Sequence, residues 1–153
     1  MNKIVINTCY GGFGLSALAL KMLYELKNPG KELYFYRRVF ESMQKLDKYY
    51  KISDLDNCVY YDAFSIDLGE EFSHHLGDNS DEIDNNYVWW NNLVESRHDP
   101  DLIRVVETLG EKANGPCANL EIVEIKENKY RIDEYDGYEN IEIFPGGGWI
   151  EIK

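Results

Sequence analysis

The residues of this chain that most clearly suggest chemistry form a glycine-rich turn, Tyr10-Gly11-Gly12-Phe13-Gly14. Glycine permits positive φ angles and lets a ligand approach the backbone closely. Ser16 follows as a predicted helix N-cap, and the unpaired backbone N–H groups at a helix N-terminus attract anions. The turn therefore predicts a site for a small anion, such as the phosphate of a nucleotide.

The spacing of these glycines differs from the known phosphate-binding motifs. It is neither the GxGxxG of dinucleotide-binding domains nor a P-loop, since no GK[ST] follows. A second interpretation is that Gly11, Gly12 and Gly14 only allow a helix and a strand to pack closely. The sequence leaves both interpretations open.

Two consecutive arginines, Arg37 and Arg38, are the second candidate for anion binding. They lie where a strand predicted at residues 32–37 ends. If this strand runs parallel to residues 2–7 in a right-handed βαβ unit, both arginines reach the edge that carries the glycine turn. Guanidinium groups clamp phosphates in a bidentate manner, and nearby aromatic rings could stack on a base. The rings in question are Tyr10, Phe13 and Tyr36, and the alternatives are salt bridges for the arginines and core positions for the rings.

Arg97 and His98 precede a second predicted helix, whose N-terminus is a further candidate anion site. His98 has the chemistry of a general base, but no nucleophile beside it is identifiable. His74 and His75 are adjacent, and no other ligands converge with them at metal spacing. We therefore expect no catalytic residue, no metal and no cofactor.

The excess of acidic over basic residues limits the classes of molecule that this protein can bind. The 153 residues include 28 acidic and 16 basic side chains, for a net charge of −12, which argues against duplex nucleic acid as a partner. Two interpretations of the acidic surface remain open. Its charge keeps the protein soluble, or its carboxylates take the place of phosphates in the nucleic-acid-binding site of a host protein. The three cysteines show no metal spacing, and the sequence shows neither a secretory leader nor a long apolar segment. We expect a reduced, cytoplasmic location without membrane contact.

The pattern of apolar residues predicts an α/β or α+β fold in one domain over residues 1–153. Helices are expected at 17–27 and 100–114, the latter capped by Asp99, within a mixed sheet of about six strands. Strands are expected at 2–7, 32–37, 58–64, 120–125, 130–135, 141–144 and 149–152, and residues 87–90 are a further strand candidate. The C-terminal segments suggest hairpins, 120–125 with 130–135 and 141–144 with 149–152. Residues 39–55 fit a helix or a short strand, and 76–86 read as a mobile loop.

Three segments resemble a family of small phage and prophage proteins: INTCYGGFGLS, DPDLIRVVETLGEKANG and LEIVEI with YRIDEYDGYE. Its members share a KIVIN-x-CYGGFxLS start and a second half with VVEELGEKANG, LKIVEI and EYDG. The family is mostly described as hypothetical, so the resemblance implies a phage origin more than an activity. The C-terminal IEIFPGGGWIEIK replaces the usual tail of the family.

Together these features predict a non-catalytic phage-type protein that sequesters a phosphorylated small molecule, such as a nucleotide immune signal, to counter bacterial defence. One alternative is an acidic inhibitor of a host nuclease or defence factor, and another is a small nucleotide-processing enzyme. Exposed strands at the chain ends also suggest a homo-oligomer formed by edge pairing.

Overall fold

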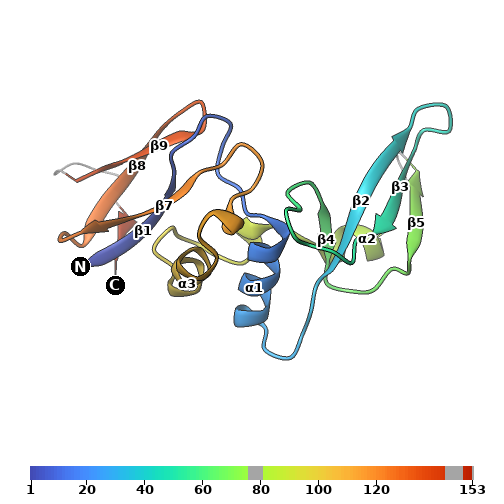
Figure 1. The fold of residues 1–153 in the computed structure, drawn as a ribbon, viewed down its shortest axis with the longest axis horizontal. Coiled ribbons are helices and arrows are strands. Elements are labelled where there is room, and N and C mark those ends of the chain that lie inside the picture. The colour runs from blue at the N-terminus through green and yellow to red at the C-terminus, as the bar shows by residue number, and fades with distance from the viewer. Residues whose placement is uncertain (76–80, 144–149, 153) are drawn as a thin grey trace.

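The computed structural model describes residues 1–75, 81–143 and 150–152. It is an α+β arrangement in which two main helices lie between a five-stranded sheet and a group formed by the N-terminal strand and the C-terminal strands (Figure 1). The helices are α1 (Ala17–Lys27), α2 (Asp81–Asn86) and α3 (Pro100–Leu109), with 3₁₀ turns η1 (Trp90–Asn92) and η2 (Gly110–Ala113). The strands are β1 (Asn2–Asn7), β2 (Tyr34–Glu41), β3 (Leu46–Lys51), β4 (Asp62–Phe64), β5 (Glu71–His75), β6 (Tyr87–Val88), β7 (Leu120–Ile125), β8 (Lys129–Tyr135), β9 (Tyr138–Glu142) and β10 (Ile150–Glu151).

Strand β1 is buried on both faces. It pairs antiparallel with β7 in a two-stranded ribbon, with Asn7 opposite Leu120. Val5 packs on the α1 and α3 side, whereas Ile4 and Ile6 pack with Tyr130 toward β8. Successive side chains of a strand point to opposite faces. Because both faces of β1 are covered, the consecutive residues Ile4, Val5 and Ile6 are all apolar.

A second, three-stranded sheet in the order β10-β8-β9 covers the outer face of this ribbon. The turn Asp136-Gly137 joins β8 to β9, and both residues adopt the positive φ angles that tight hairpin turns require.

The five-stranded sheet has the order β5-β3-β2-β4-β6, and every pair in it is antiparallel. Helix α1 connects it to the other half of the molecule. Leu23 faces α3 and β1, whereas Leu20 and Tyr24 face Phe35 and Val88 of the sheet. One helix therefore contributes to both apolar cores and joins the halves.

The predicted parallel βαβ unit is wrong. β1 and β2 lie in different sheets, and β2 pairs antiparallel with β3 and β4. The crossover rule applies only when both strands share one sheet, and here β7 takes the place beside β1. The α+β class and the two main helices are confirmed, but three antiparallel sheets replace the single mixed sheet.

Both predicted C-terminal hairpins are also wrong. β7 pairs with β1, so it forms no hairpin with β8, and β8 lies between β9 and β10. Residues 144–149 lie outside the described part of the chain. In the region 39–55 the strand alternative is confirmed, because β2 and β3 form a long hairpin with a turn at residues 42–45.

The remaining predicted segments differ in their extents. Only Asp62–Phe64 of the region 58–64 is a strand, and Tyr87–Val88 is followed by η1. Of the loop expected at 76–86, residues 76–80 lie outside the described residues, and Asp81–Asn86 is a short helix.

Candidate functional site

The glycine turn is a packing site between distant loops. The Gly11 N–H donates to the carbonyl oxygen of Asp136, and a Cβ on Gly11 would lie 2.5 Å from the Cβ of Cys117. Gly14 meets Gly115, whose N–H donates to the Gly14 carbonyl oxygen at 3.0 Å. These contacts correspond to the packing interpretation of Gly11 and Gly14.

Gly12 lies against the turn that joins β8 to β9. A Cβ on Gly137 would come 2.2 Å from the Gly12 backbone nitrogen, whereas a Cβ on Gly12 itself would meet nothing within 4 Å. The buried Asn7 amide donates to the carbonyl oxygens of Cys9 and Gly137, which fixes the two turns relative to β1.

Ser16 caps α1, as predicted. Its Oγ accepts from the Ala19 N–H at 3.2 Å and donates to the Lys112 carbonyl oxygen at 2.5 Å. Ser16 is buried, so its hydroxyl serves the helix end rather than a ligand.

Arg97 and Phe13 come together in a structural cluster. The Arg97 guanidinium lies 3.8 Å from the centre of the Phe13 ring and makes two contacts of 2.6 and 2.8 Å with the Glu139 carboxylate. Glu139 is buried and also accepts from the Asn7 N–H. Because the Glu139 carboxylate neutralises the charge of the Arg97 guanidinium, Arg97 is not available to bind an anion.

The other residues that the sequence predicts to bind a ligand lie in separate parts of the fold. His98 Nδ1 lies 2.7 Å from the Tyr130 hydroxyl, and burial raises the pKa of Tyr130 to about 12. Tyr10 is exposed and packs on Tyr138. Tyr36 is fully buried in the five-stranded sheet, where its hydroxyl donates to the Gly69 carbonyl oxygen.

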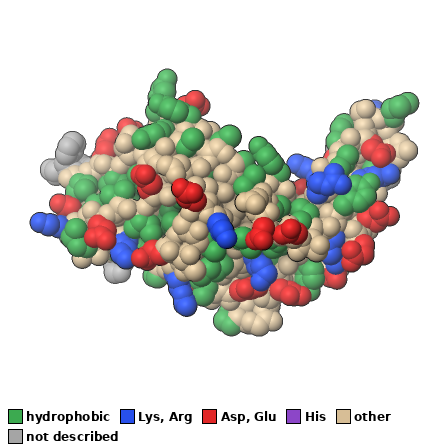
Figure 2. Space-filling model, in the orientation of Figure 1, with side chains coloured by type: hydrophobic (Ala, Val, Ile, Leu, Met, Phe, Trp, Pro, Cys, Tyr) green, Lys and Arg blue, Asp and Glu red, His purple; other side chains and the backbone are tan. Residues whose placement is uncertain are grey.

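Arg37 and Arg38 lie instead at a hollow of about 330 Å³ that we call the notch pocket. It forms where β4 stops pairing with β2: Asp62 is opposite Tyr36, and β2 continues past it with β3 as its only strand partner among the described residues. Figure 2 shows Lys and Arg side chains gathered over the β2–β3 part of this face, beside a hollow in the surface. The lining residues are Arg37, Arg38, Val59, Tyr60, Tyr61, Asp62, Trp89 and Pro116.

Aromatic rings form much of the pocket wall. Tyr61 and Trp89 are in contact, with ring centres 6.4 Å apart, and Tyr60 is 76% exposed. The Tyr61 hydroxyl donates to the Leu15 carbonyl oxygen, so this ring is fixed against the segment that precedes α1. Burial raises the pKa of Tyr61, which therefore stays neutral and acts as a donor at neutral pH.

The two arginines differ in their charge partners. Arg38 Nε lies 3.4 Å from Asp62 Oδ2, and the Asp62 side chain is only 13% exposed. Burial raises the pKa of Asp62, although the Arg38 charge and the Tyr87 hydroxyl act in the opposite direction. The Arg37 guanidinium lies over the Tyr50 ring at 5.2 Å, with no carboxylate partner among the described residues.

The loop after η2 connects the notch pocket to the glycine turn. Pro116 lines the pocket, and its neighbours Gly115 and Cys117 pack on Gly14 and Gly11. The glycine turn therefore supports one wall of the pocket without lining it.

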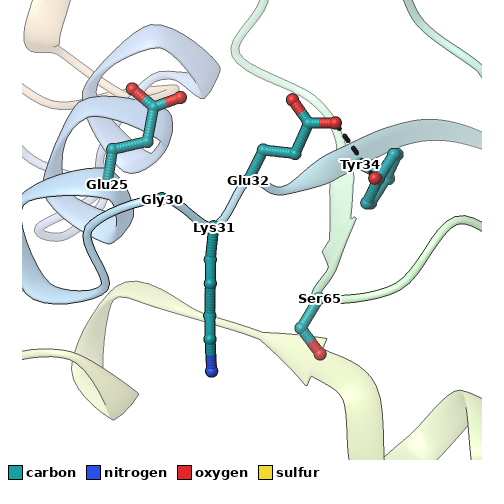
Figure 3. A pocket seen from close by; sticks show the side chains of 6 residues that line it. All are labelled: Glu25, Gly30, Lys31, Glu32, Tyr34 and Ser65. Carbon is teal, nitrogen blue, oxygen red and sulfur yellow. Dashed lines mark hydrogen bonds between the residues drawn. The ribbon is translucent and has the colours of Figure 1, made fainter.

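A second hollow of about 610 Å³ lies between the end of α1 and the start of β2 (Figure 3). The carboxylates of Glu25 and Glu32 lie on one side of it, and the Lys31 side chain extends away from both. Glu32 accepts from the Tyr34 hydroxyl at 3.0 Å, and Glu25 pairs with Lys21. Two carboxylates make this hollow unsuitable for a phosphate.

Sequence reasoning found Arg37 and Arg38 but missed Tyr60, Tyr61 and Pro116 as their neighbours. Tyr60 and Tyr61 precede β4, whereas Pro116 comes from the loop between η2 and β7. The only local signals were the aromatic pairs Tyr60-Tyr61 and Trp89-Trp90, each inside a segment predicted as a strand.

Comparison with models of known protein families, with characterised proteins and with solved structures finds no match. Within residues 1–75, 81–143 and 150–152, no three His, Cys, Asp or Glu side chains are grouped so that they could hold a metal ion. Over the same residues, no helix is long and apolar enough to cross a membrane.

Proposed function

We propose that this protein binds a small phosphorylated molecule with a flat ring, such as a nucleotide, in the notch pocket and holds it without reaction. The observation that carries the proposal is the position of Arg37, a guanidinium with no carboxylate partner in the described chain, at the rim of an aromatic-lined hollow. Arginine binds phosphate through parallel N–H donors, and aromatic faces stack on bases of any kind.

The size and charge of the pocket support this ligand class. About 330 Å³ falls within the range of small-molecule sites, which begins at roughly 300 Å³. The chain carries a net charge of −12, so an anion finds few favourable positions on its surface. Arg37 and Arg38 provide one such position.

The biological part of the proposal rests on the resemblance to phage and prophage proteins. A phage protein that removes a nucleotide signal from the host cytoplasm needs affinity and no nucleophile. Tight, unreactive binding at the notch pocket would lower the free concentration of the signal and so counter a bacterial defence.

The experiment is a thermal-shift screen of the purified protein with mono-, di- and cyclic nucleotides, ADP-ribose and inorganic phosphate. A ligand at 100 times its Kd adds about 2.7 kcal/mol to the free energy of unfolding. We expect Arg37→Ala to abolish the shift, and Tyr60→Ala to weaken binding about 10- to 100-fold through lost stacking.

Two control variants match these substitutions. Tyr135→Ala removes a ring that is 78% exposed on β8, and Arg104→Ala removes an exposed arginine of α3. Both should leave binding unchanged. Ligand recovered intact on heating supports sequestration, and chemically altered ligand would indicate an enzyme instead. A screen in which no compound shifts the melting temperature would rule out the proposal.

A further inference from the structure

Arg37 lies between the notch pocket and a further hollow of about 260 Å³ on β3 and β5, which we call the strand hollow. The residues that line the strand hollow are Lys48, Tyr49, Tyr50, Glu71, Phe72 and Ser73. The Arg37 guanidinium lies over the Tyr50 ring, 5.2 Å from the ring centre. A group that Arg37 binds is therefore next to both hollows.

The strand register places Arg37 in one row with two residues of the strand hollow. Arg37 is opposite Tyr50 in the β2–β3 pair, and Tyr50 is opposite Glu71 in the β3–β5 pair. Residues directly opposite each other project from the same face of a sheet. Because neighbouring strands lie about 4.8 Å apart, the backbones of Arg37 and Glu71 are roughly 10 Å apart. The row leads from the notch pocket into the strand hollow.

The notch pocket lies on this same face of the sheet. The Tyr61 ring packs on Phe35, with ring centres 5.4 Å apart, and Phe35 is two residues from Arg37 on β2. Side chains two residues apart on a strand share a face, so the Tyr61 ring lies on the face of Arg37. Arg37 and Glu71 are exposed, and Tyr50 is half-buried. One ligand can therefore contact both hollows from solvent.

The polar groups of the strand hollow suit a sugar better than a phosphate. The Glu71 carboxylate repels a phosphate, and Lys48 is already paired with Glu41 at 3.1 Å. A carboxylate accepts hydrogen bonds from sugar hydroxyls, as the acidic residue of dinucleotide-binding domains does from the ribose 2′-OH. The Ser73 hydroxyl donates or accepts, and the Tyr50 ring supplies an apolar face.

We infer that the ligand of the notch pocket carries a second ribose beyond its phosphates, as ADP-ribose and dinucleotides do. This inference rests on the proposed function. The base stacks in the notch pocket, Arg37 binds the pyrophosphate, and the hydroxyls of the second ribose donate to Glu71 in the strand hollow. A volume of about 260 Å³ is below the roughly 300 Å³ at which sites for whole small molecules begin, so it suits one part of a ligand.

Calorimetric titration of the full chain with ADP and with ADP-ribose tests the inference. ADP carries the larger negative charge, so charge alone favours ADP. We expect ADP-ribose to bind at least ten-fold more tightly, because only its second ribose reaches Glu71. Equal Kd values, or tighter binding of ADP, would overturn the inference and leave the proposed function standing. Binding of neither compound would also overturn it, whereas the wider nucleotide screen decides the proposed function separately.

Diadenosine diphosphate separates the two sources of a second ribose. It carries a base on that ribose, which ADP-ribose lacks. Tighter binding than ADP-ribose supports a dinucleotide as the ligand, and weaker binding supports a ligand of the ADP-ribose type. If it and ADP-ribose both bind no better than ADP, the inference is wrong.

The variant Glu71→Ala identifies the contact with the ribose. Removing a carboxylate near a bound anion strengthens binding through space, so the Kd of ADP should stay the same or fall. The Kd of ADP-ribose should instead rise about ten-fold. Glu70→Ala is the matched control, because the Glu70 side chain is 90% exposed and lines neither hollow. A Glu71→Ala variant that weakens both ligands alike, or neither, would contradict the role of Glu71, and its melting temperature without ligand verifies that it is folded.

Discussion

Gly137 and Gly12 lie backbone to backbone, so close that a Cβ on Gly137 would come 2.2 Å from the nitrogen of Gly12. One belongs to the first turn of the chain and the other to the hairpin between β8 and β9. This contact locks the C-terminal strands onto the N-terminal turn. It leaves no room for a side chain on Gly137.

Substitution of Gly137 by alanine should therefore destabilise the protein strongly. We expect a loss of about 2–4 kcal/mol in the free energy of unfolding, from the clash and from a φ of +87°. Gly30→Ala is the control, since Gly30 has a φ of +83° but nothing within 4 Å of a Cβ. It should cost only about 1 kcal/mol. Equal losses in urea titrations would show that the Gly137 contact is unimportant.

The buried pair of Arg97 and Glu139 should matter more than ion pairs at the surface. Glu139→Gln leaves a guanidinium without its charge partner in a buried position, and we expect a loss of about 3–5 kcal/mol. Replacing both residues by leucine should cost less than the sum of the single replacements, because no charge is then left unpaired. The control is Lys3→Met, which breaks an exposed pair with Glu107 and should barely change the melting temperature.

Asp62 should make stability depend on pH in the acid range. Burial raises the pKa of Asp62 above 3.8. The Arg38 charge and the Tyr87 hydroxyl lower this pKa, and the Asp47 charge raises it further. The folded chain thus holds this proton more tightly than the unfolded chain. The contribution of this pKa difference to the free energy of unfolding is complete below pH 3.8, and it is lost as the pH rises through the raised pKa.

Asn at position 62 does not titrate, so Asp62→Asn isolates this effect. The free energy of unfolding of Asp62→Asn minus that of the wild type should increase as the pH rises from 3.8 toward neutrality. Chemical denaturation of both proteins at several pH values measures the difference. A difference that is constant, or that falls with pH, would refute the assignment.

Asp99 should contribute through both its cap and its charge. Its carboxylate accepts from the backbone N–H groups of Asp101 and Leu102 at the start of α3, and it pairs with Lys27 at 2.7 Å. Asp99→Ala should cost about 1–2 kcal/mol from the lost cap alone. Asp99→Asn keeps a capping oxygen and should cost less, as measured by thermal unfolding. If Asn is as harmful as Ala, the ion pair with Lys27 is the dominant contribution.

The helices and the long strands could be predicted because their signals are local. Ser16 and Asp99 mark helix starts through side chains that bond backbone groups a few residues away, and both caps are confirmed. Apolar alternation likewise identified β7 as a half-buried strand. Both patterns depend on neighbours in the chain, so they persist whatever the tertiary arrangement.

Strand pairing could not be predicted, because it depends on residues far apart in the chain. β1 pairs with β7, and no pattern within either segment specifies the other as its partner. The notch pocket could not be predicted from the sequence for the same reason. Arg37, Tyr60, Trp89 and Pro116 become neighbours only after β2, β4 and β6 have assembled beside the loop that follows η2.

The pairing of β1 with β7 also sets an order of events on the ribosome. The five-stranded sheet lies entirely within Tyr34–His75 and Tyr87–Val88, so all its strands have been synthesised before β7 exists. β1 is made before the other described strands, yet its partner is at Leu120–Ile125. Until that segment emerges, Ile4, Val5 and Ile6 of the nascent chain lack both their strand partner and the β8 layer that covers them. Of the described strands, the earliest to be translated is thus among the last to be protected, and chaperones that bind nascent chains have their longest opportunity there.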